Sequence, residues 1–298
     1  MAQLARVRTS VLDIAYEHSG AANALPVVLL HGYPYDPRAF DEVVAIVQAA
    51  GFRTIVPYLR GYGPTRFLSP ATLRSGEQAA LGQDLLELLD ALEIRQAVLG
   101  GFDWGGRAAC VVAALWPERV KGLLSCTGYQ IQDIANAGNP VDPEQEQRFW
   151  YQHYFQTERG RNGLTQMRDQ LGRLLWKLWS PTWAFDDATY ARTAASFENP
   201  DFVDVVIHSY RHRMGSVAGD PRYAAIEAQL AKLPKIGVPT IVIHGTADGV
   251  NPHPKSEAHQ RFFTAHYERR LFENVGHNPA QENPKAFAEA IVDLSRRQ

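Results

Sequence analysis

Two hydrophobic periods alternate along the first half of the chain. Short apolar runs stand at 27–30, 54–56, 97–99 and 123–124, and each is typical of a strand buried on both faces. Between these runs, apolar residues recur at helical spacing, as Phe40, Val43, Val44 and Val47 and then as Leu81, Leu85, Leu88, Leu89 and Leu92. The alternation predicts an α/β protein with a mostly parallel sheet and helices on both faces.

The alternation is interrupted between residues 129 and 222. This segment is rich in Trp, Tyr, Arg and Gln and has no strand pattern. Strand patterns return at 239–243 and 270–272, and a closing helix follows with Phe287, Ile291 and Leu294. We therefore predict a core of residues 1–128 and 223–298, with residues 129–222 inserted as a helical cap over the strand ends.

Composition and charge exclude several classes of protein. Of the 298 residues, 45% are apolar and 21% are charged, which is ordinary for a globular enzyme and unlike a disordered chain. A net charge of −2 gives no general attraction to nucleic acid or an anionic membrane. No apolar run approaches the ~18 residues of a membrane span. We expect a small-molecule substrate, no nucleic-acid or membrane partner, and a monomer or homodimer.

The two cysteines, Cys110 and Cys126, bear on the compartment. They are too few for a disulfide framework or a multi-cysteine metal site, and both stand in apolar stretches. The first 20 residues lack the apolar core of a signal peptide. These features predict buried, reduced thiols in a cytoplasmic protein.

A glycine-rich turn follows the strand pattern that ends at Gly100. Its sequence is Gly101-Phe102-Asp103-Trp104-Gly105-Gly106, and an apolar helix follows it. A strand, a turn of the form Gly-x-nucleophile-x-Gly and a helix make up a nucleophile elbow, here with aspartate in the central place. A carboxylate there can attack carbon and form an alkyl ester. The alternative is an aspartate that only caps a helix.

The partners that an elbow enzyme needs occur later, in the required order of nucleophile, acid and base. Asp248 follows the strand pattern at 240–243, and His277 follows the one at 270–272. The strand near 123–126 ends in Thr127-Gly128 without a carboxylate, which leaves Asp248 as the better acid. These positions predict Asp103, Asp248 and His277 as a catalytic triad.

His31-Gly32-Tyr33-Pro34 follows the first buried strand pattern. An elbow enzyme places its second oxyanion donor at this point. We therefore expect the backbone N–H groups of Tyr33 and Trp104 to form an oxyanion hole. The same residues must also make the turn between strand and helix.

The chain resembles the α/β-hydrolase fold superfamily and, within it, the epoxide hydrolases. The resemblance runs from about residue 3 to the C-terminal helix. His31-Gly32-Tyr33-Pro34 is similar to the family's H-G-x-P motif, and Asp103-Trp104-Gly105-Gly106 to its D-W-G-G elbow. It implies a cap inserted after the sixth core strand, catalysis without a cofactor, and hydrolysis of an epoxide to a vicinal diol.

The resemblance also implies site residues outside the triad. Epoxide hydrolases hold the epoxide oxygen with two cap tyrosines, and the similar segments here place them at Tyr151 and Tyr210. Both could instead be ordinary aromatic residues of a helical cap. Four further residues are expected to contact substrate: His31, Pro34, Arg107 and His153.

The same motifs occur in some haloalkane and haloacid dehalogenases, so a dehalogenase is the alternative. Haloalkane dehalogenases pair the tryptophan beside the nucleophile with an asparagine after His-Gly or with a cap tryptophan; here Trp104 is present and Tyr33 takes the asparagine's place. Fluoroacetate-type enzymes carry an arginine directly after the nucleophile and another three residues later, and only the second, Arg107, is kept. A third possibility is a non-catalytic ligand-binding relative, against which the intact triad argues.

One histidine pair has the spacing of metal ligands. His208 and His212 could share one helix face, but no H-E-x-x-H motif or carboxylate at motif spacing accompanies them. Dinucleotide and phosphate-loop motifs are also missing from the sequence. We therefore predict neither a metal nor a cofactor.

Overall fold

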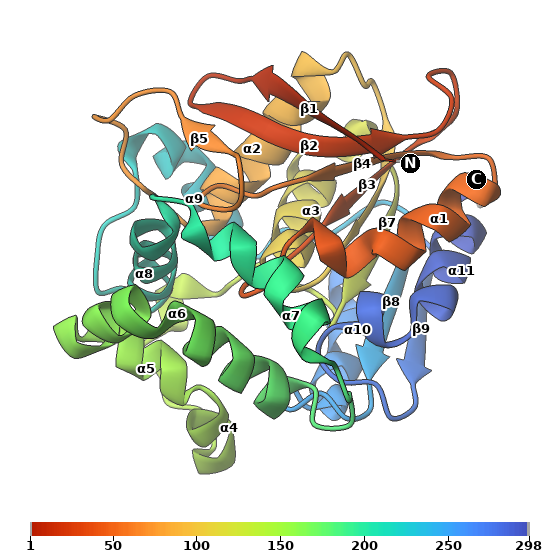
Figure 1. Ribbon diagram of the computed structural model, residues 1–298. Helices are drawn as coiled ribbons and strands as arrows, with labels where there is room; N and C mark the ends of the chain where they lie inside the picture. The colour runs from red at the N-terminus through yellow and green to blue at the C-terminus, as the bar shows by residue number, and fades with distance from the viewer. Residues whose placement is uncertain (1, 297–298) are drawn as a thin grey trace.

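The computed structural model describes residues 2–296, and a single sheet runs through their centre with helices on both faces (Figure 1). The strand order is β1-β2-β4-β3-β6-β7-β8-β9, with β5 paired to β2 beside this path. The strands are β1 Gln3–Arg8, β2 Leu12–Ser19, β3 Pro26–Leu30, β4 Arg53–Pro57, β5 Arg66–Phe67, β6 Ala97–Gly101, β7 Val120–Cys126, β8 Thr240–Gly245 and β9 Tyr267–Phe272.

Strand direction divides the sheet into two parts. The six strands from β4 to β9 along the path pair in parallel, whereas β1 and β2 pair antiparallel at one edge. Every residue of β6 and β8 is buried, as expected for strands covered on both faces. The predicted α/β fold with a mostly parallel sheet is confirmed.

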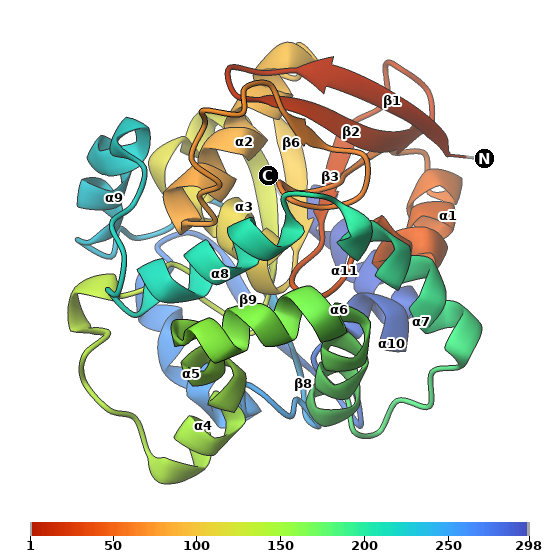
Figure 2. The same ribbon diagram turned by 60° about the vertical axis from the view of Figure 1, so that its left-hand side comes forward.

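The core helices lie in two groups on opposite faces of the sheet (Figures 1 and 2). Helices α1 and α11 contact each other on one face, and α2 and α3 contact each other on the other. The core helices are α1 Asp41–Ala49, α2 Gln78–Ala91, α3 Asp103–Leu115, α9 Ala224–Leu230, α10 Pro279–Glu282 and α11 Pro284–Ser295. Cys110 and Cys126 are both buried and free.

Five helices make up the segment predicted as a cap. It follows β7, the sixth strand along the chain when the two-residue β5 is set aside, and the described chain has no strand between residues 127 and 239. Figure 2 shows α5, α6 and α8 gathered in front of the sheet, and all three contact one another. The helices are α4 Pro143–Arg148, α5 Trp150–Gln156, α6 Glu158–Trp179, α7 Asp187–Ala194 and α8 Phe202–Arg213.

A buried carboxyl group joins this helical segment to the core. Asp36 lies after β3 and is only 2% exposed. Its oxygens accept hydrogen bonds from the Thr193 hydroxyl at 3.0 Å and the Ser196 hydroxyl at 2.6 Å. Burial raises the pKa of Asp36 to about 7, although both hydroxyls favour the carboxylate. The contact between core and cap therefore includes a carboxyl group that titrates near neutral pH.

One expectation from composition concerns membranes. Over the described residues, none of the helices combines the length and the apolar character that crossing a bilayer requires. The division of the chain at residues 128 and 223 stays a prediction.

Candidate active site

Asp103 occupies a strained turn between β6 and α3. It is the first residue of α3 and has a φ of +50°, in the left-handed region that L-residues rarely adopt. A Cβ atom on Gly105 would lie 2.1 Å from the Leu30 carbonyl oxygen, so only glycine lets α3 begin this close to β3. The turn places the Asp103 carboxylate beyond the strand ends, as the elbow pattern predicts.

The Asp103 carboxylate is hydrogen-bonded at one oxygen and faces His277 with the other. Oδ1 accepts the backbone N–H of Tyr33 at 2.8 Å, and Oδ2 lies 3.6 Å from His277 Nε2. A Cβ on Gly32 would lie 2.3 Å from Asp103 Cβ, so the approach of the two loops depends on glycine. Burial favours the neutral acid, but His277, Arg107 and the Tyr33 N–H outweigh it and lower the pKa of Asp103. The carboxylate is therefore ionised at neutral pH.

His277 lies between two carboxylates. Its Nδ1 is 2.8 Å from Asp248 Oδ2, and Asp248 Oδ1 accepts the backbone N–H groups of Val250 and Asn251, each at 2.8 Å. Burial opposes a charge on the imidazole, but Asp248 and Asp103 together raise the pKa of His277 to about 10. The three residues of the predicted triad therefore stand within reach of one another, with His277 in the middle.

Tyr151 and Tyr210 meet above this triad from two cap helices. Their ring centres are 5.4 Å apart and the rings are nearly perpendicular. Tyr210 lies 6.0 Å from the Trp104 ring, and Tyr151 accepts a hydrogen bond from the Gln152 amide at 3.0 Å. Burial raises the pKa of both phenols, to about 12 for Tyr151, and the charge of Asp103 adds to the shift. Both hydroxyls are neutral donors at neutral pH.

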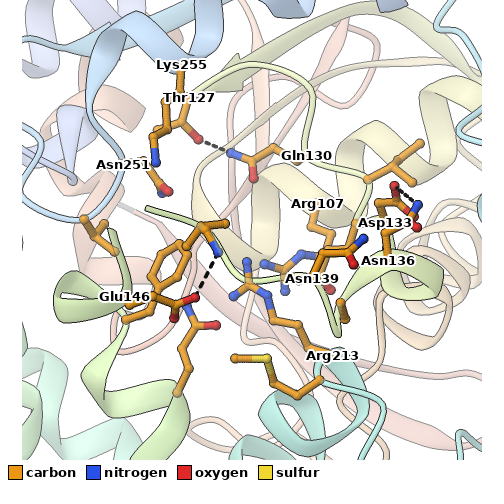
Figure 3. A pocket seen from close by; sticks show the side chains of 18 of the residues that line it. Arg107, Thr127, Gln130, Asp133, Asn136, Asn139, Glu146, Arg213, Asn251 and Lys255 are labelled. Atoms are coloured by element: carbon orange, nitrogen blue, oxygen red, sulfur yellow. Dashed lines mark hydrogen bonds between the residues drawn. The ribbon is translucent and has the colours of Figure 1, made fainter. Parts of the chain in front are cut away.

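A pocket of about 610 Å³ opens beside the nucleophile (Figure 3). Its lining includes Asp103, Arg107, Tyr151 and His153. Arg107 is buried, whereas the His153 side chain is 52% exposed and lies 2.8 Å from the Glu146 carboxylate. His153 therefore stands at the rim, while Arg107 belongs to the interior.

The structure does not place His31 and Pro34 in this pocket, contrary to expectation. The His31 ring is fully buried, with Nδ1 3.1 Å from the Gly32 carbonyl and Nε2 accepting the Leu59 N–H at 3.1 Å. Both ring nitrogens are thus used to hold backbone, and burial lowers the pKa of His31 to about 4. The Pro34 carbonyl accepts from the Trp176 indole N–H at 2.8 Å. These residues shape the loop that carries Tyr33.

The α/β hydrolase fold family matches residues 26–284, which include the three residues of the predicted triad. The chain belongs to the α/β-hydrolase fold family. This membership agrees with the order of nucleophile, acid and base along the chain and with the strand-end loops that carry them.

Three relatives show where this α/β hydrolase lies within the family. The crystal structure of a candidate epoxide hydrolase from Klebsiella pneumoniae has 46% sequence identity and a TM-score of 0.97, covering 99% of this chain and 98% of that one. An epoxide hydrolase of Caballeronia sordidicola is 34% identical over 40% of this chain, and the match covers 35% of that relative's length. Epoxide hydrolase A of Mycobacterium tuberculosis is 23% identical over 97% of this chain and 95% of its own length. The resemblance to epoxide hydrolases drawn from the motifs is confirmed.

Two residues that the sequence analysis did not single out hold the loop of His277 in this α/β hydrolase. The Ser180 hydroxyl accepts the backbone N–H of His277 at 3.0 Å and donates to Glu282 at 2.6 Å. The other oxygen of Glu282 accepts the Gly276 N–H at 2.6 Å. Neither residue belongs to a motif, since both act on backbone groups: Ser180 reaches a loop 97 residues away in the sequence, and Glu282 accepts from N–H groups of the loop just before it.

A cluster with metal-ligand chemistry lies away from the hydrolase pocket. Ligand atoms of Glu77, His212 and Glu227 all lie within 4.8 Å of one another. The acids already serve protein donors, since Glu77 accepts the Asp220 N–H at 2.7 Å and Glu227 accepts the Ala79 N–H at 3.0 Å. His212 Nε2 is 3.4 Å from Glu77, so the group forms an ion pair between core and cap whenever His212 is protonated.

Proposed function

We propose that the protein hydrolyses an epoxide to a vicinal diol through a covalent ester on Asp103. The observation that carries this proposal is the pair of neutral phenols, Tyr151 and Tyr210, above an ionised aspartate at an elbow. An epoxide needs this combination, because its ring oxygen must be protonated as carbon is attacked. The names of the relatives support the same reaction.

In the first step, Asp103 attacks a ring carbon. Its Oδ1 is engaged by the Tyr33 N–H, which leaves Oδ2 for the attack. The carbon–oxygen bond of the epoxide breaks as the new ester bond forms. Tyr151 and Tyr210 donate hydrogen bonds to the departing oxygen, and one of them supplies the proton that turns it into a hydroxyl.

Before the second step, His277 gives up its resting proton, which restores the phenol that lost a proton in the first step. His277 then removes a proton from water, and the water oxygen attacks the ester carbonyl carbon. The tetrahedral state collapses as the bond from this carbon to the alkyl oxygen breaks; that oxygen takes the proton of the new carboxyl group and leaves with the diol, so that Asp103 is again a carboxylate and His277 is again protonated. Asp248 orients the imidazole through the 2.8 Å hydrogen bond to Nδ1. The Tyr33 N–H then faces the ester oxygen where the tetrahedral charge develops, with the Trp104 N–H as the expected second donor. One such donor typically contributes about 3 kcal/mol.

Charge changes at Asp103 couple the two steps. In the resting enzyme Asp103 and Asp248 keep His277 protonated, because together they raise its pKa to about 10. Formation of the ester removes the negative charge of Asp103, so the pKa of His277 falls when its function as a base begins. The first step therefore prepares the second.

Dehalogenation is the second candidate, and two unpaired indoles favour it. Within residues 2–296, the N–H groups of Trp104 and Trp179 are buried without a hydrogen-bond partner, and such donors can bind a departing halide. The Tyr33 ring lies 5.8 Å from Trp104 and 6.3 Å from Trp179, and thus contacts both.

A substrate panel tests the proposal. Purified enzyme is offered styrene oxide, 1-bromobutane, chloroacetate and p-nitrophenyl acetate, with diol, halide and phenol measured separately. We expect diol from styrene oxide and none from the Asp103→Ala variant. Halide without diol would replace the proposal by the dehalogenase, and binding without any turnover would favour the non-catalytic relative.

A further inference from the structure

Arg107 is a buried cation with no ionic partner. It lies on α3 one helical turn after Asp103, is 3% exposed and lines the pocket. Across the described residues 2–296 it makes no hydrogen bond or ion pair, and its Nε is buried without a partner. An unpaired buried charge costs several kcal/mol in general, so its retention needs a reason.

A second arginine approaches it from the cap. Arg213, the last residue of α8, lines the same pocket, and Figure 3 shows the two side chains reaching toward each other. Burial, and then the positive charge of Arg213, lowers the pKa of Arg107 to about 10, so Arg107 remains a cation at neutral pH. The contacts of Arg213 are the Gln132 amide oxygen, 2.5 Å from Nε in one amide orientation, and the Phe149 ring centre at 6.0 Å.

A second buried arginine, Arg60, has its charge neutralised by a carboxylate. Arg60, 1% exposed, binds both oxygens of Asp84 at 2.6 and 2.7 Å. The Arg107–Arg213 pair has no such carboxylate. Two further acids of the pocket are occupied elsewhere, Asp133 by Asn136 at 2.7 Å and Glu146 by His153 at 2.8 Å.

Among the residues that the structure describes, Asp103 is the carboxyl group whose charge acts on Arg107, and it does not neutralise the pair. Its charge raises the pKa of Arg107, but it already serves as partner to His277 and loses its charge when the ester forms. Two cations beside one shared carboxylate leave room for a further anion. Guanidinium groups are well suited to this, since they bind carboxylates through two parallel hydrogen bonds.

We propose that Arg107 and Arg213 bind the carboxylate of an epoxy acid substrate. This inference rests on the proposed epoxide hydrolysis and narrows its substrate class. Asp103 and Arg107 are separated by one turn of α3, about 6 Å of helix rise. A 2,3-epoxy acid, whose carboxylate is attached directly to the epoxide ring, is the smallest substrate of this class. Tyr151 holds the ring oxygen in the same pocket.

The test compares an acid with its neutral amide. Specificity constants are measured for 3-phenylglycidate, 3-phenylglycidamide and styrene oxide. We expect the wild type to prefer the acid over the amide by 10-fold or more. Arg213→Gln should reduce this preference by about 10–100-fold, as expected when hydrogen bonds to a charged group are lost, and mainly through KM. Arg159→Gln, the same substitution at an exposed position of α6, should leave the preference unchanged.

A binding measurement separates this inference from the proposed reaction. Calorimetry with phenylacetate and phenylacetamide measures the anion site without turnover, and we expect the acid to bind more tightly to the wild type but not to Arg213→Gln. Diol from styrene oxide with no preference for the acid would overturn the epoxy acid and leave epoxide hydrolysis standing. Failure with every epoxide would refute the reaction and with it the epoxy acid, and calorimetry would then show whether the arginines still bind a carboxylate. Equal binding of phenylacetate and phenylacetamide would refute the anion site itself.

Discussion

The backbone carbonyl of Trp179 accepts the backbone N–H of His277 at 3.2 Å, and the two rings lie 5.2 Å apart. The same carbonyl accepts the N–H of Gly249, next to the acid Asp248, at 2.9 Å. Trp179 is the last residue of α6 in the cap. The end of one cap helix thus contacts the loops that carry the acid and the base.

His277→Gln should stop the reaction after its first half. The nucleophile and both tyrosines remain, but the group that activates water is gone, and loss of a general base typically costs about 10²–10⁴-fold. Intact-protein mass spectrometry after incubation with styrene oxide should show one added substrate mass, on the peptide that contains Asp103. Asp103→Ala should stay unmodified. An unmodified His277→Gln protein, where the wild type turns over, would refute the covalent mechanism.

Replacing both tyrosines should block epoxide opening itself. Tyr151→Phe with Tyr210→Phe removes the two donors to the developing alkoxide and keeps the aromatic packing. We expect diol formation to fall by about 10³-fold or more, because general acid catalysis alone is worth 10²–10⁴-fold. Tyr154→Phe, on the same helix as Tyr151, serves as the control. Wild-type rates in the double variant would remove the cap tyrosines from the mechanism.

Lowering the pH should slow hydrolysis of the ester more than its formation. The pKa of Asp103 is lowered, so the nucleophile stays ionised as the pH falls toward 5. In the ester, His277 has lost the charge of Asp103 but keeps that of Asp248, so its pKa falls below the resting value of about 10. As the pH is lowered, a larger fraction of His277 stays protonated and cannot act as a base. Rapid-quench mass spectrometry at pH 8 and pH 5 should therefore show a larger esterified fraction at pH 5. A smaller fraction would contradict the charge coupling.

Gly32→Ala should displace the nucleophile. The added Cβ would lie 2.3 Å from Asp103 Cβ and 2.6 Å from Oδ1, so the carboxylate must move away from the Tyr33 N–H. A misplacement of about 1 Å typically costs on the order of 10²-fold in rate, and we expect kcat/KM to fall by at least that much. Gly237→Ala adds the same atom at an exposed site, where it meets Thr264 Oγ1 at 3.6 Å, and should leave the rate unchanged.

Asp36→Asn should stabilise the protein in alkaline solution. The folded-state pKa of Asp36 is about 7, above an unfolded value of about 3.9. The folded state therefore holds this proton more tightly, and the stability of the wild type falls as the pH rises between these values. The free energy of unfolding of the variant should exceed that of the wild type at pH 8 by an amount on the order of 1–3 kcal/mol, which raises its melting temperature, and the difference should be smaller at pH 5. The exposed Asp187→Asn should show no such pH dependence, and a gap that narrows toward pH 8 would contradict the assignment.

Local patterns were enough to single out Asp103, Asp248 and His277, which the structure brings together, because an elbow is a local structure. Asp103 lies in a turn of six consecutive residues, 101–106, that contains three glycines. Asp248 and His277 each follow a strand that the hydrophobic pattern predicts. The antiparallel strands β1 and β2 lay outside the predicted elements, since their alternation at a sheet edge is weaker than a buried apolar run.

Side-chain direction and long-range contacts set the limit of prediction. His31 was expected at the substrate because it follows a strand end, yet its ring turns into the core and binds the Leu59 N–H. Arg213 and Ser180 gave no signal, because each acts on a group more than 90 residues away in the chain, Arg107 and His277 respectively. Such contacts depend on how the cap lies on the core.

The hydrogen bonds at the end of α6 limit how this enzyme can be recombined with its relatives. A cap segment could be exchanged between related enzymes in principle, since it is joined to the core at only two points of the chain. Here Trp179 and Ser180 bind the backbone of the His277 loop, and Trp179 also binds the Asp248 loop. A chimera with a foreign cap would lose substrate contacts and also the alignment of acid and base, unless the graft keeps this dipeptide. The evolution of substrate preference in such a cap is thereby confined to positions that leave the catalytic loops undisturbed.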